Sequence, residues 1–395
     1  MKVLGRTIAF DPASIGPLPP HEDQFPSISS LALDVAGGCN MRCAYCAESI
    51  TLPKRMPMDP EILARSVEML FKWSRPDSGV SVHFGSGEPL LQPRAVKAAG
   101  KLAKKLARDQ NRPLSLYLTT NGTQLTSQIV KWLVHGGWEV KVSMDGPREV
   151  HDRFRRGADG SGTYAKIEEN VRVLASLIPD RFSTTSVLCK GTDPGEAFYG
   201  IARLGVRKIE LVPVAAPENS AFSLGGKDLI AYRRFILDYA KKAARSRAPS
   251  VNIRFRKRLQ RVLGLGNSQV ACGAGRNFFA VSPEGSIYPC FRFIGVVDYR
   301  LGDLTSGIQK RAAGLFALGP GRPYNKRKEC RRCWAASLCD GPCFACVELI
   351  GKGSPQAGFC QMTRADCEAA LWLADVLRAK NPKKLAQLVG IDLGI

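Results

Sequence analysis

The sequence contains no apolar run of about eighteen residues, the length at which a membrane-spanning helix becomes a candidate. It also has no apolar core of the kind that an export signal needs, because only a short mixed segment follows Lys2. We therefore expect a cytoplasmic protein without a membrane partner. Since thiols stay reduced in the cytoplasm, the 13 cysteines favour metal ligation over disulfides.

Acidic side chains are the minority, since 35 Asp and Glu stand against 57 Lys and Arg and leave a net charge of +22. Basic residues concentrate in three segments, 97–112, 241–261 and 322–332. Such an excess favours a polyanionic partner, either a nucleic acid or an acidic polypeptide, although a solvated basic face explains it equally well. Nucleic acid is the weaker candidate, because no binding module is recognisable and aromatic residues do not interleave with the basic segments.

Three cysteines near the N-terminus, Cys39, Cys43 and Cys46, are spaced C-x3-C-x2-C directly after a strand-like apolar stretch, 31–36. Three thiolates on one loop can hold three irons of a [4Fe–4S] cube and leave the fourth iron open to a substrate or cofactor. A structural zinc site needs four ligands, and the next cysteine or histidine along the chain is His83. The pattern therefore favours an open iron–sulfur cluster over zinc.

With an aromatic residue, Tyr45, before its last cysteine, this spacing resembles the signature of the radical S-adenosylmethionine (SAM) superfamily. In that family the open iron chelates SAM, and an electron from the cluster splits SAM into methionine and a 5′-deoxyadenosyl radical that abstracts hydrogen from the substrate. Further motifs stand where the superfamily would place them, at the ends of successive strand-like runs: HFGSGEP at 83–89, TTNGT at 119–123 and VSMDGP at 142–147.

The resemblance implies a set of contacts to SAM. They comprise the loop after the second strand, two polar residues at later strand ends, one basic residue and one apolar residue. The residues are Ser86, Gly87, Glu88, Asn121, Ser143, Arg155 and Leu211. The planar fork of an arginine is suited to the SAM carboxylate. No catalytic base can be named from the sequence.

Strand-like and helical patterns alternate along the first 245 residues. The strand-like runs are 31–36, 79–85, 114–119, 138–144, 182–188 and 207–214, and the helical patterns are 59–73, 93–109, 126–136, 163–177, 194–204 and 227–245. Asp59 followed by Pro60 marks a helix start. Six β/α repeats predict a parallel sheet covered by helices, and a closed barrel would need about eight. The resemblance implies the same fold class, an α/β protein with a partial (β/α)6 TIM-type barrel.

A second cysteine-rich pattern starts with Cys272 and Cys290 and continues as C-x2-C-x5-C-x3-C at 330–343, followed by Cys360. These seven cysteines resemble the SPASM extension of radical SAM enzymes, which binds two auxiliary iron–sulfur clusters. Taken alone, the CxxC spacing leaves a pair of zinc ribbons open. By resemblance, the outer cluster is held by Cys330, Cys333, Cys339 and Cys360, and the inner cluster by Cys272, Cys290 and Cys343.

The inner cluster lacks one ligand that many relatives supply shortly before the first cysteine, because segment 263–271 contains no cysteine. Either one iron stays open, or Cys346 lends the missing thiolate. Cys189 and Cys367 are expected to be buried, inert thiols. Under this interpretation the cofactors are SAM and three [4Fe–4S] clusters.

A length of 395 residues suits more than one domain. We expect an extended, proline-rich N-terminal arm, a radical SAM partial barrel, a SPASM domain and a C-terminal helical tail, at 1–30, 31–250, 251–368 and 369–395. Thioether-forming relatives often carry an N-terminal peptide-recognition domain, for which this arm is too short. Recognition would then fall to a separate protein or to the basic surface.

The segments CGAG at 272–275 and SIYPCFRF at 286–293 resemble maturases that install thioether links in polypeptides. Anaerobic sulfatase maturases are also similar over most of the chain, but in those an Asp base follows the second cysteine of the extension, where this chain has Phe291. The first interpretation is therefore a radical SAM oxidoreductase that joins a cysteine sulfur to carbon in a peptide or protein. The alternatives are oxidation of Cys or Ser to formylglycine and dehydrogenation of a small molecule. A low-potential electron donor such as flavodoxin or ferredoxin is the expected redox partner.

Overall fold

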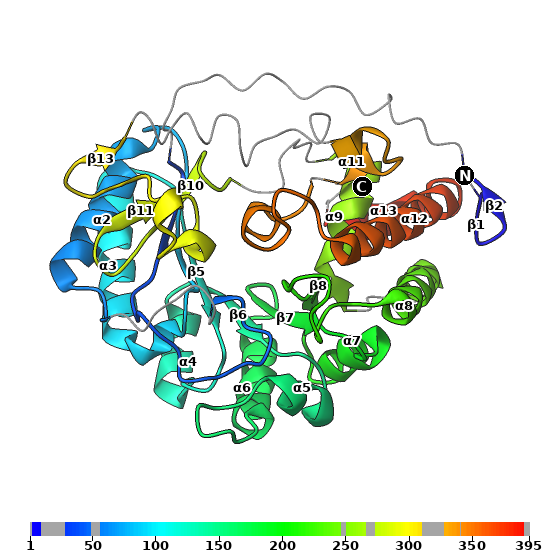
Figure 1. Ribbon diagram of the computed structural model, residues 1–395, viewed down its shortest axis with the longest axis horizontal. Helices are drawn as coiled ribbons and strands as arrows, with labels where there is room; N and C mark the ends of the chain where they lie inside the picture. Colours follow the sequence, from blue (N-terminus) through cyan, green and yellow to red (C-terminus); the bar gives the residue numbers. More distant parts are fainter. Residues whose placement is uncertain are drawn as a thin grey trace.

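The computed structural model describes residues 2–8, 28–48, 56–245, 250–265, 273–309, 328–339 and 341–390. Within these residues, eleven strands form one sheet in the order β13-β12-β11-β10-β3-β4-β5-β6-β7-β8-β9. Figure 1 shows this sheet as an open arc with helices around its outer side. The first and last strands in the order do not pair with each other, so the barrel is partial, as the sequence predicts.

Six parallel strands build the centre of the arc, each paired with the next along the chain. They are β3 (Ser30–Leu33), β4 (Val80–Phe84), β5 (Leu114–Thr120), β6 (Glu139–Ser143), β7 (Phe182–Leu188) and β8 (Lys208–Pro213). The helices between them are α2 (Pro60–Trp73), η2 (Pro89–Leu91), α3 (Pro93–Asp109), α4 (Ser127–His135), α5 (Arg148–Phe154), α6 (Tyr164–Leu177), α7 (Pro194–Ala202) and α8 (Gly226–Arg245). Of these, η2 and α5 were not predicted.

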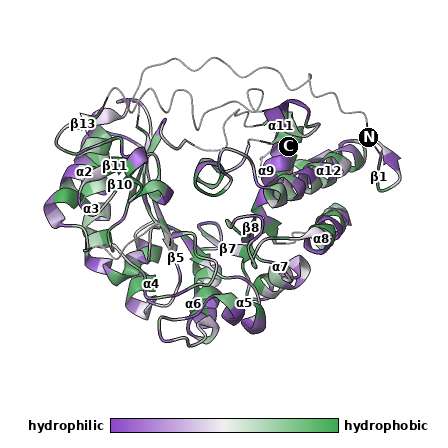
Figure 2. Ribbon diagram, in the orientation of Figure 1, coloured by the Kyte–Doolittle hydropathy of each residue, from purple (hydrophilic) through white to green (hydrophobic). Residues whose placement is uncertain are grey.

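Burial along the strands follows a period of two. In β7, Phe182, Thr184, Ser186 and Leu188 are buried, and the residues between them are half-buried. One face of each strand therefore packs against the helices, while the other lines the interior of the arc. Figure 2 shows apolar residues along the central strands and a mixture of hydrophilic and hydrophobic stretches on the surrounding helices.

Local capping explains where several helices begin. The Asp59 carboxylate accepts the backbone N–H of Glu61 at the start of α2, and Pro60 occupies the first turn. Asp193 caps α7 in the same way, followed by Pro194. A side-chain acceptor satisfies an amide that has no partner within the helix, and proline loses nothing at that position. In the described residues, no helix combines the length and apolar character that a membrane span requires.

The C-terminal part continues the same sheet. Strand β10 (Phe278–Val281) pairs in parallel with β3, and β11 (Ser286–Tyr288), β12 (Gly302–Asp303) and β13 (Gly307–Ile308) follow it in antiparallel order. At the other edge, β9 (Val251–Asn252) pairs with β8. A small hairpin, β1 (Lys2–Val3) and β2 (Arg6–Thr7), lies near the N-terminus. The remaining elements are α9 (Ile253–Val262), η3 (Phe291–Phe293), η4 (Val297–Tyr299), α11 (Lys328–Arg331), η6 (Ala336–Leu338), η7 (Cys346–Ile350), α12 (Ala357–Lys380) and α13 (Pro382–Val389).

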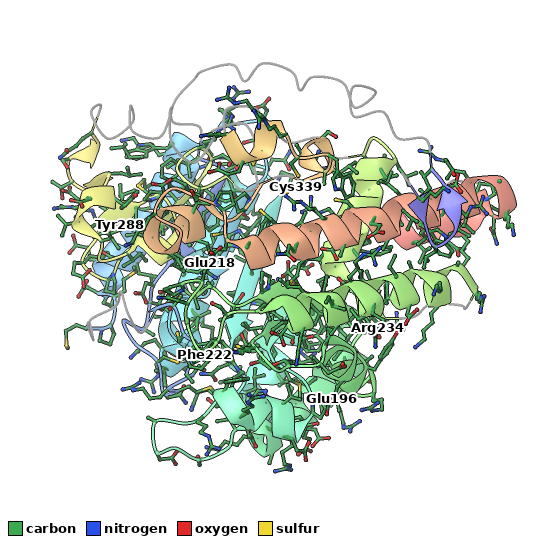
Figure 3. All side chains as sticks on the ribbon, turned by 45° about the vertical axis from the view of Figure 1, so that its right-hand side comes forward. Glu196, Glu218, Phe222, Arg234, Tyr288 and Cys339 are labelled. Atoms are coloured by element: carbon green, nitrogen blue, oxygen red, sulfur yellow. The ribbon has the colours of Figure 1, made fainter. Side chains whose placement is uncertain are left out.

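A buried ion pair fastens the long C-terminal helix to the barrel. Figure 3 shows α12 running along α8. Arg254 in α9 donates to the Asp366 carboxylate in α12 at 2.9 Å, and the Tyr232 hydroxyl in α8 donates to its other oxygen at 2.6 Å. The exposed fractions of the Arg254 and Asp366 side chains are 8% and 0%. Because a buried charge without a partner is costly, these three helices are held in one arrangement.

Candidate functional site

The loop that carries the first three cysteines begins after β3 and packs against the loop after β4. Gly37 has a φ of +63°, and its amide donates to the Asp34 carboxylate at 3.1 Å. The Glu88 amide donates to the Gly38 carbonyl at 2.9 Å. A Cβ on Gly87, whose φ is +56°, would collide with that same oxygen. Only glycine therefore fits at position 87.

Hydrogen-bond donors point at the first cysteine sulfur. Cys39 Sγ accepts the Met41 amide at 3.4 Å and the Asn121 side-chain amide at 3.7 Å. The Cys46 amide donates to the Cys43 carbonyl at 3.0 Å and closes the loop into a turn. Burial raises the pKa of the Cys39 thiol to about 11. Since metal ions hold thiols in the deprotonated form, the donors and the three sulfurs suit an iron–sulfur cluster.

Glu88 is fully buried in the loop after β4, directly before η2, and joins two neighbouring loops. One carboxylate oxygen accepts the Asn121 amide at 2.6 Å, and the other accepts the Thr120 hydroxyl at 2.8 Å and the Leu90 amide at 2.9 Å. Burial raises the pKa of Glu88, although these donors act against it. A carboxylate can accept about four hydrogen bonds, so one acceptor position remains for a ligand amine.

Arg155 lies directly after α5 and is held by Tyr45 and Asp145. Its Nη1 donates to the Tyr45 hydroxyl at 2.9 Å, and that hydroxyl donates to the Asp145 carboxylate at 2.5 Å. The second Asp145 oxygen accepts the Val187 amide at 3.0 Å. Burial opposes the charge of the guanidinium, but Tyr45, Cys43 and Asp145 together raise the pKa of Arg155. The side chain therefore stays cationic beside the cysteine loop.

Two buried polar atoms here lack a hydrogen-bond partner within the described part of the chain, the Ser86 hydroxyl and Nε of Arg155. Buried polar groups are normally satisfied, so these atoms mark positions where a polar ligand fits. The amino acid end of SAM, with its ammonium and carboxylate, has the complementary groups. Ser86 and Arg155, both predicted to contact SAM, therefore suit the amino acid end of SAM.

The other two predicted SAM contacts lie on later strands. Ser143 is half-buried at the end of β6, where its side chain faces the interior of the arc. Leu211 is fully buried in β8 and belongs to the hydrophobic core. Its side chain packs on the helix-covered face together with Ile209, so only its backbone can reach a cofactor in the barrel.

The predicted outer cysteines come together from three segments. Cys330 lies in α11, Cys339 follows η6 and Cys360 is in the first turn of α12. Burial and the neighbouring Cys339, Cys330 and Cys333 raise the pKa of Cys360 to about 11. Arg364, one turn further along α12, hydrogen-bonds Cys333 and has a raised pKa. Four sulfurs and one guanidinium therefore share this site.

The inner group surrounds Arg292. Its Nη1 donates to Cys346 Sγ at 3.7 Å. Burial opposes the charge, but Cys343, Cys346 and Cys290 outweigh it and raise the pKa of Arg292. The hydrogen bond between Cys346 and Cys343 lowers the pKa of Cys343 and raises that of Cys346. Cys346 thus joins the inner group, whereas Cys272 lies outside the described residues.

The two remaining cysteines are buried thiols. Cys189 and Cys367 are fully buried, as predicted. Burial raises the pKa of Cys189 to about 12 and raises that of Cys367 well above its usual range. No described cysteine forms a disulfide. Among the described residues, no three histidine, cysteine or carboxylate side chains converge on a position for a single metal ion.

Three charged residues of the site were not singled out from the sequence. Asp145 is within the VSMDGP motif, Arg292 is within SIYPCFRF, and Glu48 follows Cys46 by two positions. Their partners come from distant segments: the Asp145 carboxylate meets Tyr45, and Glu48 accepts the Gly87 amide at 2.9 Å. A sequence motif marks such positions but carries no signal for these pairings.

Comparison with known proteins agrees with this geometry. Residues 33–198 match the radical SAM superfamily. The chain is 25% identical over 346 residues to a cysteine-type anaerobic sulfatase-maturating enzyme of Clostridium perfringens, covering 81% of this chain and 90% of that protein. A serine-type enzyme of Bacteroides thetaiotaomicron is 32% identical over 146 residues, 35% of this chain and 34% of that protein.

Solved structures show the same fold. The structure described as anSMEcpe with bound AdoMet superimposes with a TM-score of 0.76 at 22% identity, covering 92% of this chain and 98% of that one. Streptococcus suis SuiB bound to its precursor peptide SuiA gives a TM-score of 0.57 at 14% identity, covering 84% and 76%. The cysteine loop, the ordered strand-end motifs and the family match lead to one conclusion: residues 33–198 of this chain form a radical SAM domain, the kind of domain that binds SAM and a [4Fe–4S] cluster.

Proposed function

We propose that this protein is a radical SAM maturase of the anaerobic sulfatase-maturating type, which oxidises a cysteine side chain of a peptide or protein to formylglycine. The observation that carries the proposal is the near full-length similarity to cysteine-type sulfatase-maturating enzymes, over 81% of this chain and 90% of the relative. Thioether formation, our first interpretation of the sequence, has no support among these relatives. The similarity to SuiB is one of fold alone.

In this proposal, Cys39, Cys43 and Cys46 hold the SAM-binding cluster, and Ser86 and Arg155 receive polar groups of SAM. When bound, SAM and the reduced cluster supply a 5′-deoxyadenosyl radical that removes hydrogen from carbon. The chain's contribution is placement. Gly87 allows the two loops to approach, Glu88 fixes the strand ends, and the Tyr45–Asp145 pair fixes Arg155. A guanidinium that is held in place and shielded from water suits the carboxylate of SAM.

The auxiliary cysteines are proposed to hold two further [4Fe–4S] clusters. Cys330, Cys333, Cys339 and Cys360 form the outer set. For the inner set we assign Cys346 as the fourth ligand beside Cys272, Cys290 and Cys343, because its thiol contacts that of Cys343. Burial and hydrogen bonds to sulfur tune such clusters as electron acceptors. The division into an arm, barrel, SPASM domain and tail at 1–30, 31–250, 251–368 and 369–395 belongs to the same proposal, as do a flavodoxin-like or ferredoxin-like donor and a separate recognition protein.

Formylglycine formation from cysteine requires a proton acceptor. The Cβ would lose a hydrogen atom, the thiol its proton, and one further electron would have to leave; an iron–sulfur cluster held by the auxiliary cysteines would supply the acceptor for it. Water then replaces sulfur, giving the aldehyde and hydrogen sulfide. Sulfatase maturases carry an Asp base at the position that corresponds to residue 291. In this chain the residue is Phe291, which is half-buried and packs against the core. Glu48 is the carboxylate that lines the pocket between the cysteine groups, so we assign the role of base to Glu48.

The test uses Glu48→Gln, because glutamine keeps an oxygen that can accept the Gly87 amide. Anaerobically reconstituted enzyme, a strong reductant and SAM are incubated with cysteine-containing polypeptides encoded beside this gene. Wild type should yield an aldehyde that reacts with hydrazine. Loss of a general base costs about 10²–10⁴-fold, so the variant should form at least about a hundredfold less aldehyde while still cleaving SAM.

Glu196→Gln, on the exposed first turn of α7, is the matched control and should keep wild-type rates. Equal aldehyde yields from Glu48→Gln and wild type would remove Glu48 from the mechanism. A product that has lost two hydrogens and whose thiols no longer alkylate would contradict formylglycine formation and return the thioether interpretation.

A further inference from the structure

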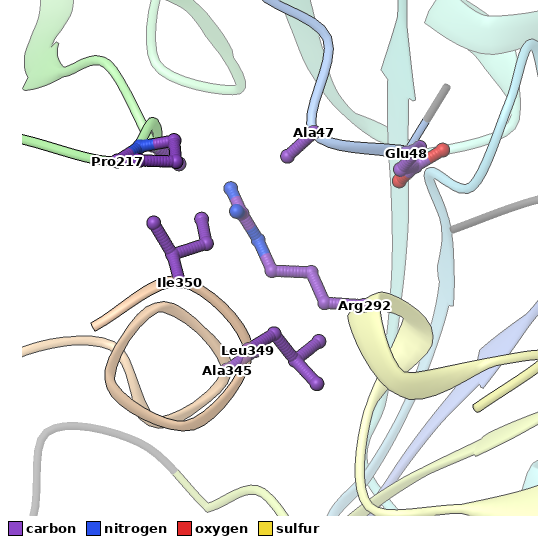
Figure 4. A pocket seen from close by; sticks show the side chains of 8 residues that line it. Ala47, Glu48, Pro217, Arg292, Ala345, Leu349 and Ile350 are labelled. Atoms are coloured by element: carbon purple, nitrogen blue, oxygen red, sulfur yellow. The ribbon is translucent and has the colours of Figure 1, made fainter. Parts of the chain in front are cut away.

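A pocket of about 130 Å³ lies between the first cysteine loop and the inner cysteine group. Three segments far apart in the sequence form its walls: the residues after Cys46, the segment after β8, and η7 with the residue before it. Arg292 projects into it from η3 (Figure 4). The lining residues are Ala47, Glu48, Ala215, Pro217, Arg292, Ala345, Leu349 and Ile350. Apart from Glu48 and Arg292, the walls are apolar.

Arg292 lies among the inner cysteines, whose thiols raise its pKa, and its side chain also reaches the pocket. Its hydrogen bond goes to the Cys346 sulfur at 3.7 Å. Within the described part of the chain, no carboxylate lies within ion-pair distance of its guanidinium. Glu48 attracts it from further away, while one Glu48 oxygen accepts the Gly87 amide. A guanidinium carries five N–H donors in a planar fork; the Arg292 side chain uses one of them in its hydrogen bond to Cys346, and its guanidinium end lies in the pocket (Figure 4).

The pocket combines one cation, Arg292, and one carboxylate, Glu48, with apolar walls; because Glu48 already accepts the Gly87 amide, Arg292 is the charged group that can recognise an anion. Water is a poor competitor in such a pocket, so each charge-assisted hydrogen bond counts for more than at an exposed surface. The fork of arginine matches the two oxygens of a carboxylate. The pocket also opens beside Ala47 and Glu48, which directly follow the first cysteine loop. An anion bound to Arg292 would therefore lie near Glu48, the proposed base.

We propose that this pocket binds an aspartate or glutamate side chain of the polypeptide substrate, close in sequence to the modified cysteine, and that Arg292 recognises its carboxylate. The inference rests on the proposed function, since it assumes a polypeptide substrate. The net charge of +22 acts in the same direction, because it draws acidic polypeptides toward the molecule before they dock. Phosphoserine would present a larger anion of higher charge and is the competing ligand.

The test measures binding separately from chemistry. A fluorescein-labelled cysteine peptide with aspartate on both sides of the cysteine is titrated anaerobically with reconstituted enzyme and SAM, and anisotropy is recorded. Replacing the aspartates by asparagine should weaken binding to wild type about tenfold or more, the size expected for a charge-assisted contact. Arg292→Gln should bind both peptides equally and weakly, and Arg292→Lys should lie between.

Arg234→Gln is the matched control, because it removes one positive charge from the exposed side of α8 (Figure 3). It should retain the preference for aspartate. Circular dichroism and iron content should be the same for Arg292→Gln and wild type. An unchanged preference in Arg292→Gln, or equal affinity of wild type for both peptides, would overturn the proposal.

Two outcomes separate this proposal from the proposed function. If the aspartate preference depends on Arg292 but no peptide gives an aldehyde, the subsite stands and formylglycine formation fails. If aldehyde forms with equal KM on both peptides and in Arg292→Gln, the function stands and the subsite fails. Tighter, Arg292-dependent binding of a phosphoserine peptide would overturn the assignment to a carboxylate.

Discussion

Two arginines stand beside cysteine groups in this molecule, and their surroundings differ. Arg155 contacts the Tyr45 hydroxyl, which in turn bonds the fully buried Asp145. Arg292 donates a hydrogen bond to the Cys346 thiol and lines a pocket whose other charged residue is Glu48. Both have raised pKa values because negative groups outweigh burial.

The difference shows how one fold can use the same residue type for two tasks. A carboxylate that is built into the protein fixes Arg155 before any ligand binds, which suits a cofactor that returns in every catalytic cycle. Arg292 donates to the Cys346 thiol and has no carboxylate within ion-pair distance among the described residues, so the rest of its hydrogen-bonding capacity is open to a ligand. An arginine that the protein holds in place orients its ligand. An arginine that can still donate to a ligand discriminates between substrates.

Breaking the first arrangement should have the largest effect. Arg155→Leu leaves the Asp145 carboxylate buried without the cation that lowers its pKa; breaking a directly contacting buried pair typically costs about 3–5 kcal/mol, and because the Tyr45 hydroxyl lies between these two groups we expect the lower end of that range. We expect a matching loss in the free energy of unfolding, measured by urea denaturation, and loss of SAM binding in equilibrium dialysis. The double variant Arg155→Leu/Asp145→Asn should regain most of the stability but not the SAM binding. Wild-type stability of the single variant would show that the pair is not a unit.

The second prediction concerns the inner cysteine group. It tests whether this group has four cysteine ligands or only three, like the first cysteine loop. With Cys346 as a fourth ligand, Cys346→Ala should leave one iron of the inner cluster without a protein ligand, which changes the spectrum of that cluster and lowers the iron content, by about four atoms per chain where the whole cluster is lost. Iron and sulfide assays and electron paramagnetic resonance measure this change. Cys189→Ala, at a buried thiol outside the groups, should leave the iron content unaltered. An unchanged spectrum for Cys346→Ala would mean that the inner group is a second three-cysteine site with an open iron.

The smallest effect concerns the bridge between Arg155 and Asp145. Tyr45→Phe removes one hydroxyl that both donates and accepts, so we expect a loss of about 1 kcal/mol in the free energy of unfolding. The affinity for SAM should fall only severalfold, because the Asp145 charge still attracts the guanidinium. A loss as large as that of Arg155→Leu would place the anchoring role in the hydroxyl instead of the carboxylate.

Local periodicity was enough to predict much of the fold. The six central strands and their main helices follow the alternation of apolar residues, and Asp59 with Pro60 gave the start of α2. The short strands β9 to β13 have two to four residues each, too few to show a period. Pairing of β10 with β3 depends on a contact between distant segments, which no local pattern encodes.

The candidate site was predictable where chemistry repeats at fixed spacing. The cysteine loop and the strand-end motifs fall together as expected, and the outer cysteines share a site. The side-chain direction of Leu211 was not predictable, because a strand of six residues has two faces and the motif does not say which one is covered. The surroundings of Arg292 were not predictable either, since its pocket is assembled from three segments that meet only in the folded chain.

The pairing of β10 with β3 also matters while the chain is being made. Leu31 and Phe279 lie opposite each other in this pairing, and both are fully buried. During translation, β3 and the first cysteine loop leave the ribosome long before β10 is synthesised. Until then the edge of β3 is unpaired, and such an edge invites association with other nascent chains. Strand β10, which is synthesised late, thus covers the edge of the strand that carries the first cysteine loop.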